Sequence, residues 1–184
     1  MKVIETKLKG CVIIEPKVHG DERGFFLETY QKKTYLEKAK INYNFVQDNY
    51  SRSSKGVLRG LHFQVNKPQG KLVTVNKGGV YDVAVDIRPD SETFGEWEGV
   101  LLTEENKRQF WLPPGFAHGF CVLSDTADFQ YKCTEYYDPS DEGGIIWDDA
   151  ELNIEWPEVD VKLSEKDVAL PSFKSFREST HLNF

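Results

Sequence analysis

The sequence has few cysteines, no long apolar run and no cluster of basic residues. Its three cysteines form no C-x-x-C pair, so we expect no disulfide framework and predict buried, reduced thiols in a cytoplasmic protein. The first six residues lack the apolar core of a signal peptide, and no segment reads as a membrane span. The formal net charge of −7 without any basic run argues against nucleic-acid binding.

The chain also lacks repeats, low-complexity tracts and a recognisable linker. Its 184 residues, with 13% aromatic and 29% charged side chains, fit one well-packed domain over residues 1–184. The segment Ser51–Gly56 does not have Walker spacing, so no P-loop is expected.

Short apolar runs recur along the chain, separated by Gly, Pro, Asn and Asp. They are enriched in β-branched and aromatic residues, which is typical of strands. They cover residues 11–14, 25–30, 45–50, 57–63, 72–75, 80–87, 97–102, 110–112, 119–123 and 129–134. The pattern predicts an all-β jelly-roll sandwich or barrel with a few short helices. One helix is predicted over Thr34–Lys40, with Thr34 as N-cap and Glu37 completing a capping box.

Polar and apolar residues alternate through residues 80–87. Asp82 and Asp86 share one face of this strand, which suits a jelly roll whose interior is a ligand cavity. The two carboxylates are either an acid pair or parts of a polar network, and the pattern favours the network.

Two segments each deliver one histidine from a strand or strand end, Gly56–Gln64 and Pro113–His118. They resemble the two halves of the cupin motif. A metal-binding cupin has a second His and a nearby Glu in the first half, where this chain has Gln64 and a non-acidic residue such as Gln69. Two imidazoles without a carboxylate make a poor zinc or iron site, so we predict no metal and assign the histidines to proton chemistry.

Each candidate residue also has an ordinary structural explanation. A lone histidine such as His62 is usually a satisfied core residue, but Arg59, His62 and Gln64 share one short strand. Each unsatisfied buried polar group costs about 1–3 kcal/mol, so a cavity lining is the better explanation. Lys71 is either a solvated strand start or a cation that stabilises a carbonyl oxygen. Tyr131 is either a packing residue or, if it points inward, a proton donor.

Basic side chains offer candidate phosphate ligands as well as ordinary surface positions. Guanidinium groups match phosphate oxygens in geometry. The candidates are Arg23, Arg59 and Lys166.

Taken together, the motifs resemble the dTDP-4-dehydrorhamnose 3,5-epimerase family of the cupin superfamily. The matching segments span nearly the whole chain in the family's order: residues 20–26, 45–49, 56–64, 69–73, 82–88, 113–120 and 163–167. The resemblance implies a homodimer of jelly rolls that exchange N-terminal strands, with no metal or redox cofactor. The tail from about Ala169 to Phe184 carries no motif.

The resemblance also implies roles for individual residues. His62 corresponds to the general base, Asp167 to its partner carboxylate, Tyr131 to the proton donor on the opposite side of the sugar, and Lys71 to the residue that stabilises the enolate oxygen. His118 would contact the sugar. The positions expected to bind the nucleotide or its phosphates are Arg23, Glu28, Gln47, Asn49, Arg59, Glu142 and Lys166. The segment Asp141–Gly144 departs from the family's more usual Glu-Arg pattern.

The predicted reaction is 3,5-epimerisation of dTDP-4-dehydro-6-deoxy-D-glucose to dTDP-4-dehydro-L-rhamnose, a cofactor-independent step of dTDP-L-rhamnose biosynthesis. The ketone at carbon 4 activates both neighbouring carbons, and a base and an acid on opposite faces invert each centre. The alternatives are a single-site 3- or 5-epimerase, a 3,4-ketoisomerase, a metal-dependent cupin oxygenase and a binding module without activity. The nucleotide base and the deoxysugar are open at this point.

Overall fold

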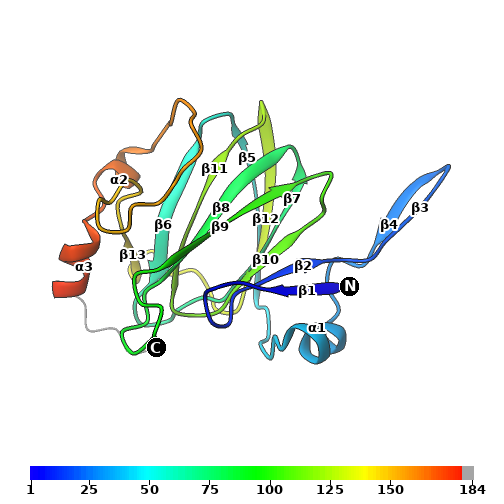
Figure 1. Cartoon of the computed structure of the whole chain (residues 1–184), viewed down its shortest axis with the longest axis horizontal. Coiled ribbons are helices and arrows are strands. Elements are labelled where there is room, and N and C mark those ends of the chain that lie inside the picture. Colours follow the sequence, from blue (N-terminus) through cyan, green and yellow to red (C-terminus); the bar gives the residue numbers. More distant parts are fainter. Residues whose placement is uncertain (180–184) are drawn as a thin grey trace.

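Two β-sheets form the body of the protein, whose computed structural model describes residues 1–179 (Figure 1). The six-stranded sheet has the order β1-β2-β10-β7-β12-β5, and the five-stranded sheet has the order β13-β6-β11-β8-β9. Neighbouring strands within each of these two sheets run antiparallel. The strands of the first sheet are Lys2–Glu5, Val12–Glu15, Gln109–Leu112, Lys71–Lys77, Thr126–Cys133 and Gln47–Ser54, in sheet order. Those of the second are Glu142–Gly144, Leu58–Gln64, Phe116–Val122, Gly79–Asp86 and Trp97–Thr103.

The space between the two sheets holds the main hydrophobic core. Alternate residues of each strand point into it, because successive side chains of a strand face opposite sides. The core includes Val73 and Phe129 from one sheet and Val80, Ala84 and Phe120 from the other. Burial of these apolar side chains, at about 1.5–3 kcal/mol for each large one, holds the sheets together.

The outer face of each sheet is covered as well. The helix α1 (Lys32–Ala39) packs Tyr35 against Ile14 and Trp111 of the six-stranded sheet. The C-terminal segment, with α2 (Glu165–Val168) and α3 (Phe173–Ser179), covers the five-stranded sheet (Figure 1). Phe173 and Phe176 of α3 are buried there, so the tail without a motif has a packing role up to Ser179. Its last residues, 180–184, lie outside the described part.

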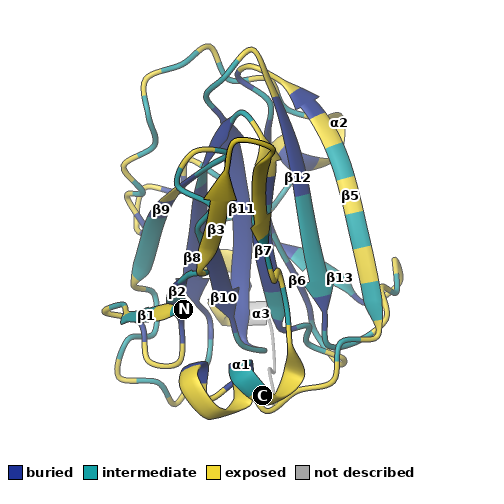
Figure 2. Cartoon of the chain, turned by 90° about the vertical axis from the view of Figure 1, so that its right-hand side faces the viewer, coloured by how far each residue is buried: buried dark blue, intermediate teal, exposed yellow. Residues whose placement is uncertain are grey.

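A two-stranded hairpin, β3 (Val18–Asp21) and β4 (Gly24–Leu27), extends from the body (Figure 1). Figure 2 shows that it is exposed along almost its whole length. Phe25 and Phe26 at its end are 59% and 71% exposed. Apolar side chains this exposed, side by side on a projecting hairpin, indicate an interaction surface.

The structure confirms the prediction of an all-β sandwich with a few short helices, but it corrects the helix cap. The helix α1 begins at Lys32, and the side chain of Gln31 accepts a hydrogen bond from the Thr34 backbone N–H at 2.6 Å. Thr34 is therefore inside the helix, and the capping box predicted with Glu37 is wrong. The reason is that the Gln31 amide oxygen caps the helix in place of a hydroxyl. Lys40, in the left-handed conformation, ends it.

The remaining predictions concern the number of strands and the state of the cysteines. The sequence pattern missed strands β1, β3 and β13. The predicted buried thiols are confirmed, since Cys11, Cys121 and Cys133 are all buried and free. Within residues 1–179, no helix has the length and apolar character needed to cross a membrane.

Candidate active site

A pocket of about 320 Å³ opens between the two sheets. Its walls contain the predicted catalytic residues from both sides. His62 (β6) and His118 (β11) come from the five-stranded sheet, while Lys71 (β7) and Tyr131 (β12) come from the six-stranded sheet. The imidazole and the phenol therefore line opposite walls of one cavity. The full lining is Ser51, Arg59, His62, Lys71, His118, Phe120, Phe129, Tyr131, Tyr137, Glu142, Ser164, Lys166 and Asp167.

Strand register explains how these side chains meet. His62 lies directly opposite His118 across the β6–β11 pair, so both project from the same face. On the facing sheet Tyr131 pairs with Val73, and Lys71 lies two residues from Val73, on the same face. The Lys71 ammonium is 6.0 Å from the centre of the Tyr131 ring.

His62 is held by Asp167, which comes from the short helix α2. The imidazole Nε2 is 2.6 Å from Asp167 Oδ1. Ser164 caps the helix by accepting the Asp167 backbone N–H at 3.1 Å, and its hydroxyl donates to Asp167 Oδ2 at 2.7 Å. The carboxylate is 4% exposed and fixed on both oxygens, so it orients the imidazole.

The environment of His62 suits a general base. Burial lowers the pKa of the imidazole below its ordinary value, and the Asp167 carboxylate opposes that effect without overcoming it. The ring is therefore neutral at pH 7. With Nε2–H donated to Asp167, the lone pair on Nδ1 is the one left to accept a proton.

Burial in the pocket shifts the pKa values of both Tyr131 and Lys71. Burial raises the pKa of the Tyr131 phenol to about 12, so the hydroxyl keeps its proton at neutral pH. Burial also lowers the pKa of Lys71. A poorly solvated ammonium interacts more strongly with developing negative charge than a hydrated one does.

His118 is fixed by a buried carboxylate. Its Nε2 lies 2.9 Å from Asp82 Oδ2, and Asp82 is fully buried. Asp86 instead binds Arg88, with Nη2 to Oδ2 at 2.6 Å. Asp82 and Asp86 therefore belong to separate polar networks and are not an acid pair.

Of the other predicted ligand-binding residues, some line the pocket and others lie outside it. Arg59 lines the pocket, and its Nη2 donates to Ser53 Oγ at 3.2 Å. Gln47 and Asn49 lie on the edge strand β5, hydrogen-bonded to each other at 3.0 Å. Neither lines the pocket. Arg23 and Glu28 lie on and beside the projecting hairpin, and Arg23 pairs there with Asp21 at 2.5 Å.

A cluster at the pocket opening joins β13, the loop before it and α2. Glu142 Oε2 accepts hydrogen bonds from the Tyr137 hydroxyl and from Lys166 Nζ, each at 2.5 Å. Its other oxygen, Oε1, lies 3.9 Å from His62 Nδ1. Burial alone would raise the pKa of the Glu142 carboxyl, but the bonds from Lys166 and Tyr137 bring it below its usual value.

Sequence reasoning missed Tyr137 and the role of Ser164. Ser164-x-x-Asp167 is a detectable helix-cap pattern, whereas no sequence pattern distinguishes Tyr137 from its neighbour Tyr136.

The residues present do not make a metal site. Gln64, in the place of a metal-binding histidine, is buried and fastens a loop. Its Nε2 donates to Lys67 O at 2.7 Å and Tyr136 O at 3.2 Å, and its Oε1 accepts from Asp138 N at 2.7 Å. Nowhere in residues 1–179 do three His, Cys, Asp or Glu side chains gather around a common point suited to a metal ion.

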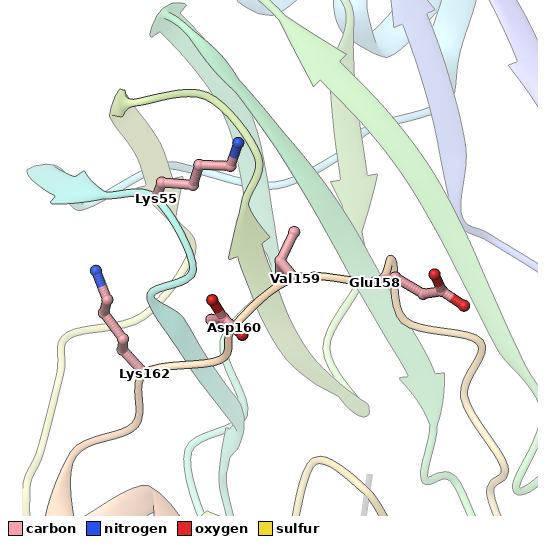
Figure 3. A pocket seen from close by; sticks show the side chains of 5 residues that line it. All are labelled: Lys55, Glu158, Val159, Asp160 and Lys162. Atoms are coloured by element: carbon pink, nitrogen blue, oxygen red, sulfur yellow. The ribbon is translucent and has the colours of Figure 1, made fainter.

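A second pocket, of about 660 Å³, lies beside the β5–β6 turn and contains none of the predicted site residues (Figure 3). It is lined by Lys55, Glu158, Val159, Asp160 and Lys162.

The wall of this second pocket has a structural function. The backbone of Lys162 pairs with the chain at the start of β6. Its N–H donates to Gly56 O at 2.8 Å, and its carbonyl accepts from Leu58 N at 3.0 Å. Gly56 has φ +82°, and a Cβ there would lie 2.1 Å from Asp160 O. This close backbone contact brings the chain that leads into α2, and so Asp167, alongside the strand that carries His62.

Comparison with known proteins places the chain among nucleotide-sugar epimerases. A family model described as dTDP-4-dehydrorhamnose 3,5-epimerase matches residues 5–175. The dTDP-4-dehydrorhamnose 3,5-epimerase of Shigella flexneri is 56% identical over 169 residues, which cover 91% of this chain and 93% of that protein.

Solved structures agree. The crystal structure of dTDP-6-deoxy-D-glucose-3,5-epimerase from Legionella pneumophila, in complex with dTDP-4-keto-L-rhamnose, is 57% identical with a TM-score of 0.92, covering 94% of this chain and 93% of that one. A 3'-monoepimerase from Streptomyces bikiniensis, in complex with dTDP-quinovose, is 30% identical with a TM-score of 0.88, covering 94% and 88%.

The fold, the pocket and the comparisons are consistent with one another. The two packed sheets are a cupin-type jelly roll, and the family match extends over both walls of the pocket. The chain belongs to the dTDP-4-dehydrorhamnose 3,5-epimerase family of isomerases.

Proposed function

We propose that this chain converts dTDP-4-dehydro-6-deoxy-D-glucose to dTDP-4-dehydro-L-rhamnose by inverting carbons 3 and 5, in dTDP-L-rhamnose biosynthesis. The observation that carries the proposal is the placement of His62 and Tyr131 on opposite walls of one pocket, with Lys71 beside Tyr131. An inverting site needs such an arrangement, because the proton must leave one face of the sugar and return to the other.

The proposed mechanism assigns one task to each side chain. His62 accepts the proton from the carbon next to the ketone, and the resulting imidazolium is stabilised by Asp167. The electron pair left on carbon forms an enolate, whose oxygen is stabilised by Lys71, while His118 contacts the sugar. Tyr131 then delivers its proton to the opposite face. The same side chains serve carbon 3 and carbon 5 in turn.

Solvent exchange tests this reaction directly. Pure protein incubated with the keto-sugar nucleotide in deuterated water should introduce deuterium at both carbons, detected by NMR. Absence of label at both carbons would reject the proposal.

A single-site epimerase is the second candidate, favoured by the structural similarity to the 3'-monoepimerase from Streptomyces bikiniensis. Deuterium at carbon 3 or carbon 5 alone would select it.

The nucleotide is proposed to bind where two copies of the chain meet, in a homodimer that exchanges N-terminal strands. The support is the exposed hairpin with Phe25 and Phe26 on β4, and the absence of Arg23 and Glu28 from the lining of the pocket in their own chain. In the dimer these two residues would complete the partner's site. The proposed nucleotide and phosphate ligands are Arg23, Glu28, Gln47, Asn49, Arg59, Glu142 and Lys166.

Complementation between variants tests the exchanged arrangement. Co-expressed Arg23→Ala and His62→Ala chains form mixed dimers in which one site has both native residues only if Arg23 acts in trans. Random pairing then restores about a quarter of the wild-type activity. No recovery in purified mixed dimers would show that Arg23 acts within its own chain, and full activity of the Arg23→Ala homodimer would show that Arg23 does not act at all.

A cytoplasmic location is proposed on the basis of the three buried free cysteines, which suit a reducing compartment. Oxidation state in the native cell, read by thiol labelling, would test it.

A further inference from the structure

In the Glu142 cluster, made of Tyr137, Glu142 and Lys166, the two oxygens of the carboxylate have different surroundings. Both donors bind the same carboxylate oxygen, Oε2, at 2.5 Å. The other oxygen, Oε1, lies 3.9 Å from His62 Nδ1. The Glu142 side chain is 11% exposed, so its charge is only weakly screened by solvent.

His62 therefore has a carboxylate at each ring nitrogen, Asp167 at Nε2 and Glu142 at Nδ1. Strand pairing fixes this arrangement, because β13 runs beside β6 with Gly144 opposite His62 and Glu142 opposite Gln64. The charged and titratable groups around the imidazole are Asp167 and Lys166 from α2, Glu142 from β13, Lys71 from β7, His118 from β11, Tyr131 from β12 and Tyr137 from the preceding loop. Glu142 is also paired with the ammonium of Lys166.

The basic partner, Lys166, lines the pocket and is exposed to solvent. The Lys166 side chain is 55% exposed, against 11% for Glu142. A diphosphate carries more negative charge than one carboxylate and competes for the ammonium. When Lys166 binds phosphate instead of Glu142, the carboxylate retains only the hydrogen bond from the neutral Tyr137 hydroxyl. The negative charge of Glu142 is then no longer neutralised, and it stabilises a proton on His62.

We propose that Glu142 is a positioning residue that couples the occupancy of Lys166 to the proton affinity of His62, so that binding of the diphosphate makes the base stronger. The proposal rests on the proposed function in taking Lys166 as a phosphate ligand. Its consequence is that the imidazole remains weakly basic in the empty pocket and gains basicity when substrate is bound.

The test follows the titration of His62 by NMR, which does not depend on turnover. The chain has four histidines, and the His62 signal is assigned by its loss in His62→Ala. Glu142→Gln should lower the pKa of His62 because a carboxylate is removed. Lys166→Gln should raise it because Glu142 is no longer neutralised. In the double variant the effect of Lys166→Gln should disappear, as expected when one residue acts through another.

The second measurement is the change in the pKa of His62 when thymidine diphosphate is added. The pKa of His62 should rise on binding in the wild type and rise less in Glu142→Gln, since the direct effect of the phosphates is common to both. Glu142→Asp keeps the charge and should recover part of the rise. The matched control is Glu165→Gln, which removes the same charge from an exposed position on α2 and should leave the titration unchanged.

Two results would overturn the coupling. One is an equal effect of Lys166→Gln with and without Glu142, which would mean direct repulsion between Lys166 and His62. The other is an equal rise on thymidine diphosphate binding in the wild type and in Glu142→Gln. Failure of the proposed reaction is a separate result, because it is read as absent deuterium exchange in the wild type while the histidine titration is still measured.

Discussion

Replacing Asp167 by Asn tests the part of the mechanism that depends most on geometry. The substitution keeps the size and shape of the side chain but removes the charge that lies 2.6 Å from His62. In the proposed reaction His62 gains a proton, so the neutral amide would stabilise the resulting imidazolium far less than the carboxylate does. A structural role alone would leave the chemical step nearly unchanged.

The expected size follows from burial. A hydrogen bond to a charged group contributes about 1.5–3 kcal/mol, and the upper end applies because Asp167 is 4% exposed. A loss of about 3 kcal/mol in the transition state corresponds to roughly a 10²-fold fall in kcat. The acid limb of the pH profile should also move to lower pH, since the carboxylate that raises the pKa of His62 is gone.

The assay is the rate of deuterium uptake at carbons 3 and 5, measured from pH 5 to 9 with saturating substrate. The matched control is Asp160→Asn, an exposed aspartate near the second pocket, which should keep its rate within about twofold. Activity of Asp167→Asn within about threefold of wild type, with an unmoved acid limb, would refute the assignment of Asp167 to the imidazolium.

Three further predictions concern the base, the acid and the turn that precedes β6. His62→Ala should abolish exchange at both carbons. In the wild type, kcat/KM should fall only below about pH 6.5, because burial lowers the pKa of His62. A midpoint of this fall clearly above pH 6.5 would contradict the reasoning. Tyr131→Phe should slow inversion while leaving proton exchange measurable, and an equal loss of both would argue against separate faces. Gly56→Ala should lower the free energy of unfolding in urea by about 2–4 kcal/mol, since its Cβ would lie 2.1 Å from Asp160 O. Gly24→Ala is the control, with φ +128° but nothing within 4 Å of its Cβ, and an equal loss there would show that the backbone angle alone matters.

Local patterns predicted most of the fold because each strand carries its own signal. The alternation around Asp82 and Asp86 correctly placed both on one buried face, but it did not show that they serve different partners. That outcome depends on His118 and Arg88, which reach the two carboxylates from other parts of the chain. The prediction for the cap of α1 was wrong because it looked for a Ser, Thr, Asp or Asn side chain. Gln31 is not a preferred capping residue, but its side-chain oxygen reaches the Thr34 N–H.

The site was predicted in its members more than in its arrangement. The resemblance gave His62, Tyr131 and Lys71, and the structure places them around one pocket. The interaction of Glu142 with Lys166 was not predictable, because these residues are 24 positions apart and meet only after the C-terminal segment folds across the five-stranded sheet. Arg23 and Glu28 illustrate the same limit, since no pattern within one chain says whose pocket they reach.

Gln64 stands at one of the positions where a metal-binding cupin has a ligand, and here it has a structural role. Its amide uses both donor and acceptor to anchor the loop that carries Tyr137 over the pocket. A histidine at this position would lose these three hydrogen bonds, and with them the attachment of the loop to β6. A Gln64→His substitution would therefore loosen the loop that carries Tyr137 at the pocket without assembling a metal site inside it.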